Sequence, residues 1–266
     1  MDIEKLEHND INYISDLLPI GWEGVIPTIE FYTKTNFCFP IKATIDSKIV
    51  GIGTTIIHNE TAWLAHIIVH ADYRNQSIGK IITQTLVDNS YTKGCETIYL
   101  LATELGEPVY KKIGFETETE YIVFKREVIN DSFKNTENIV PFNNDFKNQI
   151  LNLDKQVSGE DRILLLEQHL SDGFLYVQDN ETQGFYLPNL GDGLIIANTN
   201  SAGQELMKLR LKLKDFAAFP IDNIGATEFM RQNNFNEVRK EKRMRLGKER
   251  NWEPKNIYNR IGGNLG

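Results

Sequence analysis

The stretch IIVHADYRNQSIGKIITQTL, residues 67–86, restricts the fold of this chain more than any other. An apolar run typical of a buried β-strand leads into a polar turn, and the turn opens a segment with helical spacing at Ile81, Ile82 and Leu86. The first backbone N–H groups of such a helix have no partner within it, and the helix dipole adds partial positive charge there. The pattern therefore predicts an α/β fold with a receptor for a phosphate or pyrophosphate.

Three residues of this turn suit an anionic ligand. Arg74 and Lys80 offer charge-assisted contacts, and Gly79 lets a ligand approach the backbone closely. Taken alone, these features fit an ordinary strand-to-helix turn with a solvated Arg74 equally well. The turn becomes specific only together with the rest of the chain.

The remainder of the first half alternates strands and helices in the same way. Helices are expected at 9–18, 22–34, 79–90 and 107–114, and strands at 38–46, 48–57, 61–69, 96–102 and 115–126. The first two long strands are at hairpin spacing around Asp46 and Ser47, and Gly114 is expected to end the last helix.

The second half repeats this succession after a polar segment, 127–143, that is expected to be a linker. Helices are expected near 144–156, 161–171, 202–213 and 223–232, and strands at 174–179, 182–188, 192–198, 215–221 and 235–246. The repetition predicts two tandem domains of α/β class, at 1–126 and 144–250, each a twisted mixed β-sheet flanked by helices. The tail at 251–266 is expected to be a surface extension.

Charge and composition exclude several classes of function. A formal net charge of -8 and a pI near 5.3 argue against broad nucleic-acid binding, which needs a basic face. No apolar stretch reaches the roughly 20 residues that cross a bilayer, and the start shows no signal peptide, so no membrane partner is expected. Cys38 and Cys95 are expected to be buried thiols in a reducing cytoplasm, and no residue cluster has metal-ligand spacing.

The turn after the strand resembles the acetyl-CoA-binding motif of the GNAT superfamily of N-acetyltransferases, Val-x-Pro-x-x-Arg-x-x-Gly-x-Gly. Val69, Arg74 and Gly79 match, whereas Ala71 replaces the usual Pro and Ser77 replaces a Gly. The resemblance, over residues 1–126, implies that acetyl-CoA binds at Ile67, Ile68, Val69, Arg74, Asn75, Gln76, Ser77, Ile78, Gly79 and Lys80. It also implies that a backbone N–H of 67–69 stabilises the thioester oxygen.

A second stretch, LLATELGEPVYKKIGF, is similar to the closing motif of that family, in which a Tyr precedes Gly-Phe by four residues. The resemblance implies that Tyr110 protonates the departing thiolate, a role that suits a neutral phenol. The alternative is that Tyr110 only packs on the sheet. His66, three residues before Val69, is a candidate general base or a core residue, and Glu23, Glu104 and a water chain are the alternatives for the base.

The acceptor site is less clearly marked. Trp22 and Glu23 lie where such folds often line it, and Trp22 could stack on an acceptor, although a Trp in this position is more often part of the core. Asp161 and Arg162 are expected either to form an ion pair that fixes a loop or to reach the acceptor. The second half resembles the acetyltransferase-like domain that follows a GNAT domain in some bacterial tandem proteins, at SGEDR (158–162), LGDGLIIAN (190–198), FPIDN (219–223) and MRQNNFNEVRKEKRMRLG (230–247).

The second half is not expected to bind the cofactor strongly. Its corresponding turn, 198–203, has no Arg or Lys before Lys208, so a pyrophosphate would be held poorly.

The resemblance of the first half implies direct transfer of an acetyl group from acetyl-CoA to a small-molecule amine. A protein or peptide N-acetyltransferase and a non-catalytic sensor of acyl-CoA or amine are the alternatives. The sequence does not predict an oligomeric state.

Overall fold

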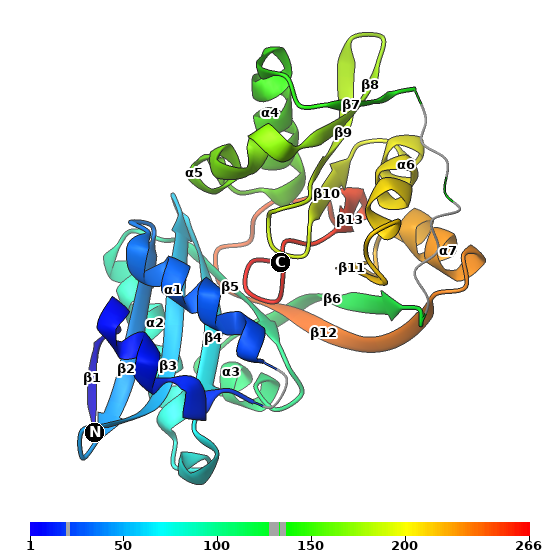
Figure 1. Ribbon diagram of the computed structural model, residues 1–266. Helices are drawn as coiled ribbons and strands as arrows, with labels where there is room; N and C mark the ends of the chain where they lie inside the picture. The colour runs from blue at the N-terminus through cyan, green and yellow to red at the C-terminus, as the bar shows by residue number, and fades with distance from the viewer. Residues whose placement is uncertain (20–21, 128–132, 134–136) are drawn as a thin grey trace. The chain divides into compact units, whose positions relative to one another are not determined.

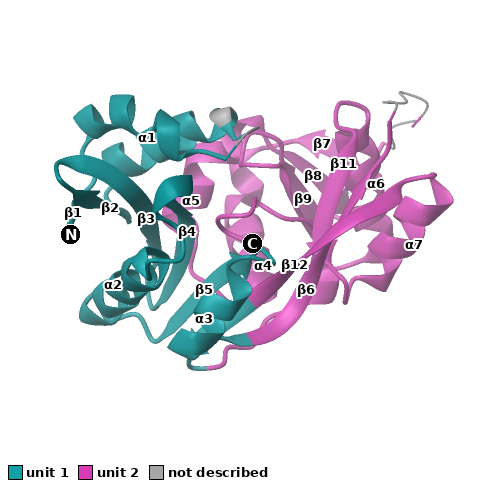
Figure 2. Cartoon of the chain, turned by 90° about the horizontal axis from the view of Figure 1, so that it is seen from below, with its two compact units in different colours: residues 1–116, 244–248 teal, residues 117–243, 249–266 magenta. Residues whose placement is uncertain are grey.

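The computed structural model describes residues 1–19, 22–127, 133 and 137–266 (Figure 1). The described chain divides into two compact units (Figure 2). Unit 1 comprises residues 1–116 and 244–248, and unit 2 comprises 117–243 and 249–266. The first part of unit 1 ends at residue 116, ten residues before the predicted end of the first domain at 126. Unit 1 also includes residues 244–248, which the prediction assigned to the second domain. The predicted functional boundaries stay a prediction, and each unit is described by itself.

Unit 1 is built on a mixed sheet whose strands follow the order β1-β2-β3-β4-β5, with β12 beside β5. The strands are β1 (Asp2–Lys5), β2 (Cys38–Ile45), β3 (Lys48–His58), β4 (Thr61–Val69), β5 (Thr97–Ala102) and, from Met244 onward, β12 (Asn236–Gly247). Strands β1 to β4 pair antiparallel and β4 pairs β5 in parallel. Asp46 (φ 49°) and Ser47 (φ 65°) form the tight turn that the sequence predicts between β2 and β3.

Helix α2 (Ile78–Thr92) packs its apolar face against β3, which positions the start of the helix at the end of β4. Gly53 makes this approach possible, because a Cβ there would lie 2.8 Å from Ile82 and from Leu86. The other helical segments of unit 1 are η1 (His8–Tyr13), η2 (Ser15–Leu17), η3 (Glu23–Val25), α1 (Ile26–Lys34), η4 (Ala71–Tyr73) and α3 (Glu107–Ile113).

The prediction of one helix at 9–18 is wrong: two short 3₁₀ segments, η1 and η2, occupy this region. Asp10 stabilises the start of η1, because its carboxylate accepts hydrogen bonds from Glu7 N and from Lys42 Nζ, both at 2.8 Å. The bond from Glu7 N is half of a capping box, which satisfies a backbone donor at the start of a helical segment.

Unit 2 contains a second sheet with the order β13-β10-β9-β8-β7, in which the paired strands run antiparallel. These strands are β7 (Ile139–Pro141), β8 (Phe174–Gln178), β9 (Glu181–Leu187), β10 (Leu194–Ala197) and β13 (Ile257–Asn259). Strand β11 (Phe216–Pro220) pairs antiparallel with β6 (Glu116–Lys125), and β6 also neighbours β12. The helical segments are η5 (Asn144–Phe146), α4 (Lys147–Ser158), α5 (Ile163–Leu166), η6 (Glu167–Asp172), α6 (Asn200–Leu211), α7 (Ile224–Gln232) and η7 (Pro254–Asn256).

The predicted mixed α/β class is confirmed, and most strands and helices expected in the second half are found close to their predicted bounds. The single helix expected at 161–171 is instead the four-residue α5 followed by the 3₁₀ segment η6. Two further segments differ. Strand β7 lies inside the predicted linker and pairs with β8, while 128–132 and 134–136 of that linker lie outside the described residues. The expectation that the tail extends over the surface is wrong, because β13 pairs with β10 and Ile257, Tyr258 and Asn259 are buried.

Candidate active site

Strand β4 carries a β-bulge beside β3. Ile52 pairs with Ile68 and Thr54 pairs with Ala65, so Gly53 faces both His66 and Ile67. His66 adopts a left-handed backbone conformation with φ 47°, which costs a non-glycine residue about 1–3 kcal/mol and is typical of functional sites. The bulge changes the direction in which the His66 side chain leaves the strand.

The other edge of β4 is open along its second half. In the part of the chain that the structure describes, its parallel register with β5 covers only Thr61 to Trp63, opposite Thr97 to Tyr99. The peptide groups of β4 beyond Trp63 therefore have no ladder partner on the β5 side. An open strand edge of this kind can pair with the amide groups of a bound ligand.

The turn between β4 and α2 presents unpaired backbone N–H groups. Ile81 N donates to Ser77 O at 3.0 Å as the first bond of the helix, so among the described residues the N–H groups of Ile78, Gly79 and Lys80 have no acceptor. Asn75 (φ 63°) and Ser77 (φ 64°) are both left-handed, which curls the loop around these groups. This arrangement suits an anion.

The side chains of the turn leave that concave backbone accessible. Arg74 is exposed, and its Nε donates to Val69 O at 3.3 Å, which ties its position to the end of β4. A Cβ built on Gly79 would meet only Val69 Cγ2, at 3.6 Å, so the protein itself does not fill the space beside it. Ile78 is buried and fixes the first turn of α2 in the core, whereas Lys80 is exposed. The residues present therefore fit a pyrophosphate group.

Tyr110 lies on α3, and its ring packs against the same core cluster as Ile67 and Val69 of β4. The ring meets Phe115 edge-on, with 6.1 Å between centroids. Burial raises the pKa of Tyr110 to about 12, so the phenol keeps its proton at neutral pH. Its hydroxyl is thus a neutral donor on the core cluster that includes the open part of β4.

His66 lies in an aromatic cluster that the sequence did not indicate. Its Nδ1 is 3.0 Å from the hydroxyl of Tyr32 on α1, and Trp22 meets the imidazole edge-on with 6.4 Å between centroids. Burial lowers the pKa of His66 to about 4, so the ring is neutral at neutral pH. Trp22 is 39% exposed and therefore available for contact with an acceptor. The side chain of Glu23 lies outside the described structure, and Glu104 is exposed.

Asp161 and Arg162 do not pair with each other, which corrects one of the two expectations for them. Arg162 is buried and its Nε donates to Asp154 Oδ2 of α4 at 3.1 Å, whereas Asp161 pairs with Lys155 at 3.3 Å. Both contacts lie within unit 2 and fix the segment after α4. A role of either residue at the acceptor stays a prediction. The sequence pattern indicated neither Tyr32, whose partner His66 is 34 residues away, nor Asp154, whose partner Arg162 lies beyond the end of α4.

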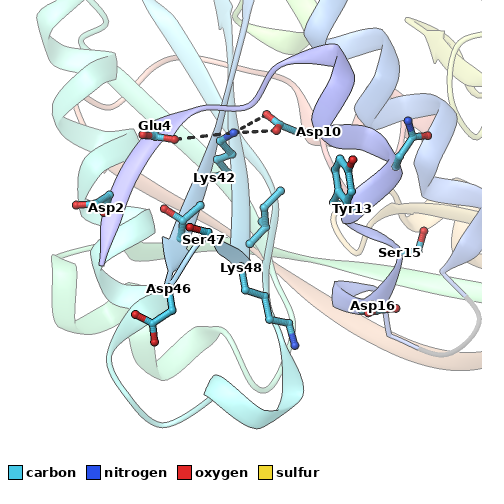
Figure 3. Close-up of a pocket in the computed structure, with 13 residues that line it drawn as sticks. Asp2, Glu4, Asp10, Tyr13, Ser15, Asp16, Lys42, Asp46, Ser47 and Lys48 are labelled. Atoms are coloured by element: carbon cyan, nitrogen blue, oxygen red, sulfur yellow. Dashed lines mark hydrogen bonds and ion pairs between the residues drawn. The ribbon is translucent and has the colours of Figure 1, made fainter.

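Unit 1 also contains an open hollow of about 800 Å³ beside β1, β2 and the 3₁₀ segments (Figure 3). Carboxylates line much of it, together with Lys42 and Lys48, and Lys42 forms ion pairs with Asp10 at 2.8 Å and Glu4 at 3.9 Å. None of its lining residues is a predicted site residue.

Within the described ranges, no group of residues could hold a metal ion, and no helix combines the length and apolar character needed to cross a membrane.

Residues 11–115 match the model of a family described as the acetyltransferase (GNAT) family. The matched segment contains β4, the turn, α2 and Tyr110, and the match confirms the resemblance for this part of the chain. It covers less than half of the chain, so the tandem relation of the second half stays a prediction. No curated protein matches the chain.

A solved structure matches the whole chain in fold. It is a Pyrococcus horikoshii protein, provisionally named an acetyltransferase, with a TM-score of 0.85 and 23% identity over 100% of this chain and 95% of that one. The ribosomal-protein-S18-alanine N-acetyltransferase of Escherichia coli matches with a TM-score of 0.41 and 21% identity, over 45% of this chain and 79% of that one. A Thermoplasma acidophilum PaiA N-acetyltransferase, solved in complex with coenzyme A, matches with a TM-score of 0.39 and 18% identity, over 45% of this chain and 92% of that one.

Proposed function

We propose that unit 1 is an N-acetyltransferase that transfers the acetyl group of acetyl-CoA to the amine of a small-molecule acceptor. The observation that carries the proposal is the β4–α2 corner, where an unpaired strand edge leads directly to unpaired N–H groups at a helix start. The family match over residues 11–115 supports acetyl transfer as the reaction. The chain itself would supply every group that binds and positions the two substrates.

In this proposal the pyrophosphate binds the N–H groups of residues 75–80, with Arg74 as the cationic partner. The pantetheine arm pairs with the open edge of β4, and a backbone N–H of Ile67, Ile68 or Val69 stabilises the thioester oxygen as it gains negative charge. Holding both substrates in one geometry contributes by lowering the entropic barrier to their reaction.

The reaction is a direct attack. The acceptor nitrogen forms a bond to the thioester carbon, the carbon–sulfur bond breaks, and the electron pair leaves on sulfur. Tyr110 gives its proton to that sulfur, a step that its raised pKa of about 12 allows because the phenol remains protonated before reaction. His66 takes the proton that the acceptor nitrogen loses, and Trp22 lines the acceptor side. Solvent then returns both residues to their starting protonation states.

The test is release of free thiol from acetyl-CoA with a panel of small amines, corrected for background hydrolysis. Tyr110→Phe is expected to lower turnover about a hundredfold while CoA affinity stays within twofold, since a positioned acid contributes about 10² or more to a rate. CoA binding without thiol release for any amine or peptide would identify a sensor instead. Release with peptides alone would identify a protein or peptide N-acetyltransferase.

We also propose a cytoplasmic location. Cys38 and Cys95 are free and buried, and burial raises their pKa values to about 12 and about 11. Both thiols therefore stay protonated and unreactive, which suits a compartment that keeps cysteines reduced.

A further inference from the structure

Tyr32 is buried at 2% exposure on α1, with its hydroxyl directed at His66. The oxygen lies 3.0 Å from Nδ1, and the two rings are tilted by 43° with 5.7 Å between centroids. Trp22 closes another side of the imidazole edge-on. The imidazole is therefore held by a hydrogen bond at one nitrogen and by ring contacts on two sides, at the residue where β4 bulges.

The hydrogen bond at Nδ1 of His66 decides whether Nε2 of the same ring can accept a proton. A neutral imidazole carries one proton on either nitrogen, and the other nitrogen accepts. If Tyr32 donates to Nδ1, the proton lies on Nε2 and that atom can only donate. If Nδ1–H donates to the Tyr32 oxygen, Nε2 keeps its lone pair and can accept a proton from an acceptor amine.

We propose that Tyr32 is a positioning residue that accepts a hydrogen bond from Nδ1–H of His66 and so keeps the Nε2 lone pair available to the acceptor nitrogen. This inference rests on the proposed function of unit 1. During attack, the proton on the acceptor nitrogen moves to Nε2 while the nitrogen lone pair forms the new bond to carbon. His66 then carries a positive charge, which the polar oxygen of Tyr32 stabilises through the same hydrogen bond.

The weak basicity of His66 fits this order of events. With a pKa of about 4, the ring does not remove a proton from a free ammonium group, whose pKa is roughly 10. It accepts the proton only once bond formation to the thioester carbon has made the nitrogen more acidic. The acceptor must therefore arrive as the free amine, and the orientation of Nε2 matters more than its basicity.

The test combines kinetics with nuclear magnetic resonance. Tyr32→Phe keeps the ring and removes the hydroxyl. Turnover with acetyl-CoA and a reactive amine is expected to fall about tenfold, with CoA affinity within twofold, because general bases contribute about 10² or more and only their orientation is lost here. In a His66→Ala background the same change is expected to have no further effect. A double variant whose loss of turnover equals the product of the two single losses would overturn the inference, because Tyr32 would then act independently of His66.

Thr33→Val is the matched control on the same helix. It removes a hydroxyl that donates to Glu30 O at 2.8 Å without touching His66, and its turnover is expected to stay within twofold of the parent protein. An equal loss in Thr33→Val and Tyr32→Phe would mean that α1 was merely disturbed, and this result would also contradict the inference.

The tautomer can be measured even if the protein does not turn over. Imidazole nitrogen shifts of ¹⁵N-labelled protein, assigned with His66→Gln, are expected to show His66 protonated at Nδ1 and to shift toward the Nε2–H form in Tyr32→Phe. A parent protein with the proton on Nε2 would overturn the inference. The expected tautomer together with no thiol release would instead count against the proposed reaction alone.

Discussion

The β4–α2 corner of unit 1 and the β10–α6 corner of unit 2 share a local plan, a buried strand that runs into a helix, but differ in what lies beside the strand. In unit 1 the register between β4 and β5 ends at Trp63. In unit 2 the chain's own β13 pairs with β10, and Arg260 N beyond it donates to Ala218 O of β11 at 2.8 Å. The strand edge that β5 leaves unpaired in β4 is paired in β10 by the C-terminal segment.

The starts of the two helices, α2 and α6, also differ, because in the described part of the chain the protein itself caps and covers only the start of α6. Thr199 caps α6, because its hydroxyl accepts from Ala202 N at 3.3 Å, whereas Ser77 gives α2 no such cap among the residues described. Tyr258 covers Gly203 so closely that a Cβ there would lie 2.2 Å from its ring. The sequence predicted weak cofactor binding in the second half from missing charge. The structure adds a second physical reason: the chain occupies both the strand edge and the helix start.

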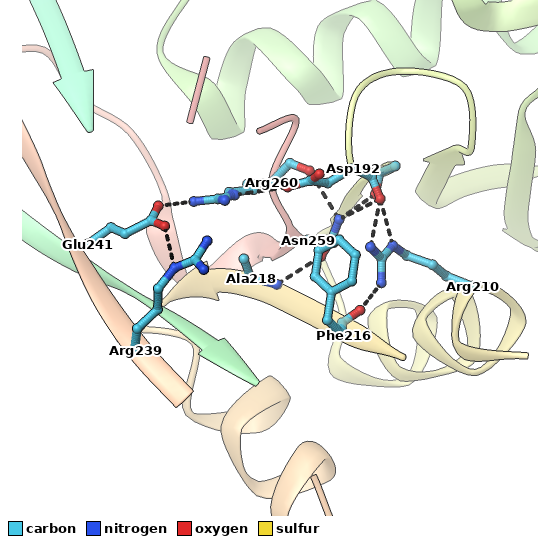
Figure 4. Close-up of polar contacts among 9 residues, drawn as sticks. Asp192, Arg210, Phe216, Ala218, Arg239, Glu241, Asn259 and Arg260 are labelled. Atoms are coloured by element: carbon cyan, nitrogen blue, oxygen red, sulfur yellow. Dashed lines mark hydrogen bonds and ion pairs between the residues drawn. The ribbon is translucent and has the colours of Figure 1, made fainter. Parts of the chain in front are cut away.

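Side-chain contacts anchor the C-terminal segment in unit 2 (Figure 4). Asn259 is fully buried, donates to Gly193 O at 2.7 Å and accepts from Ala218 N at 3.0 Å. Arg260 pairs with Asp192 at 3.2 Å and with Glu241, while Arg210 donates to the Asp192 carbonyl at 2.7 Å. Burial lowers the pKa of Arg210 to about 10, which still leaves it charged at neutral pH. These contacts make the segment part of the core of unit 2.

The largest expected effect tests whether the filled corner depends on this anchor. Asn259→Ala leaves the buried N–H of Ala218 and the buried carbonyl of Gly193 without their partner, and each such group costs about 1–3 kcal/mol. We expect the free energy of unfolding to fall by about 2–4 kcal/mol in urea denaturation. Asn236→Ala, at an exposed position, is the control and should stay within about 0.5 kcal/mol of the parent. A loss of that small size in Asn259→Ala would show that the segment is not anchored there.

The next effect concerns the open corner. Calorimetric titration with CoA is expected to give one site per chain, because of the two corners compared in the described structure only β4–α2 has an unpaired strand edge with a cation beside it. Arg74→Ala should weaken that affinity about tenfold, the cost of about one charge-assisted hydrogen bond. Arg231→Ala removes the same charge from an exposed position of α7 in unit 2 and should leave affinity unchanged. Two sites per chain would contradict the comparison, and an unchanged affinity in Arg74→Ala would remove the pyrophosphate assignment.

A smaller effect separates ligand contact from protein packing. Gly79→Ala fits the protein, because the added Cβ meets only Val69 Cγ2 at 3.6 Å, and an alanine in a helix should be stabilising by up to about 1 kcal/mol. The same methyl group would stand where the pyrophosphate approaches the backbone. We therefore expect CoA affinity to fall severalfold with no loss of thermal stability. Gly263→Ala, where a Cβ meets nothing within 4 Å, is the control. Full affinity in Gly79→Ala would mean that no ligand approaches this residue.

Local patterns predicted the parts of this fold that are set by neighbouring residues. The bounds of β4 and the hairpin at Asp46 and Ser47 follow from alternating apolar residues and turn chemistry. Strand β13 has three residues and depends on Ala218 and Gly193, which lie tens of residues away, so no local pattern indicated it. The same holds within the site. Arg74 and Gly79 belong to a local motif, whereas the contact of Tyr32 with His66 joins two elements 34 residues apart.

The smallest expected effect concerns Ser77, one of the two residues at which the turn departs from the motif that it resembles. Ser77 has φ 64°, a conformation that glycine adopts without strain, so Ser77→Gly should raise the free energy of unfolding by up to about 1 kcal/mol. Its hydroxyl makes no capping bond in the described structure, so little is lost with it. CoA affinity should stay equal or rise about twofold, as the loop closes more easily on its ligand. Thermal melting and CoA titration measure both quantities. A fall in affinity greater than threefold would show that the Ser77 hydroxyl itself contacts the ligand, which would make the serine part of the open corner rather than a strained substitute for glycine.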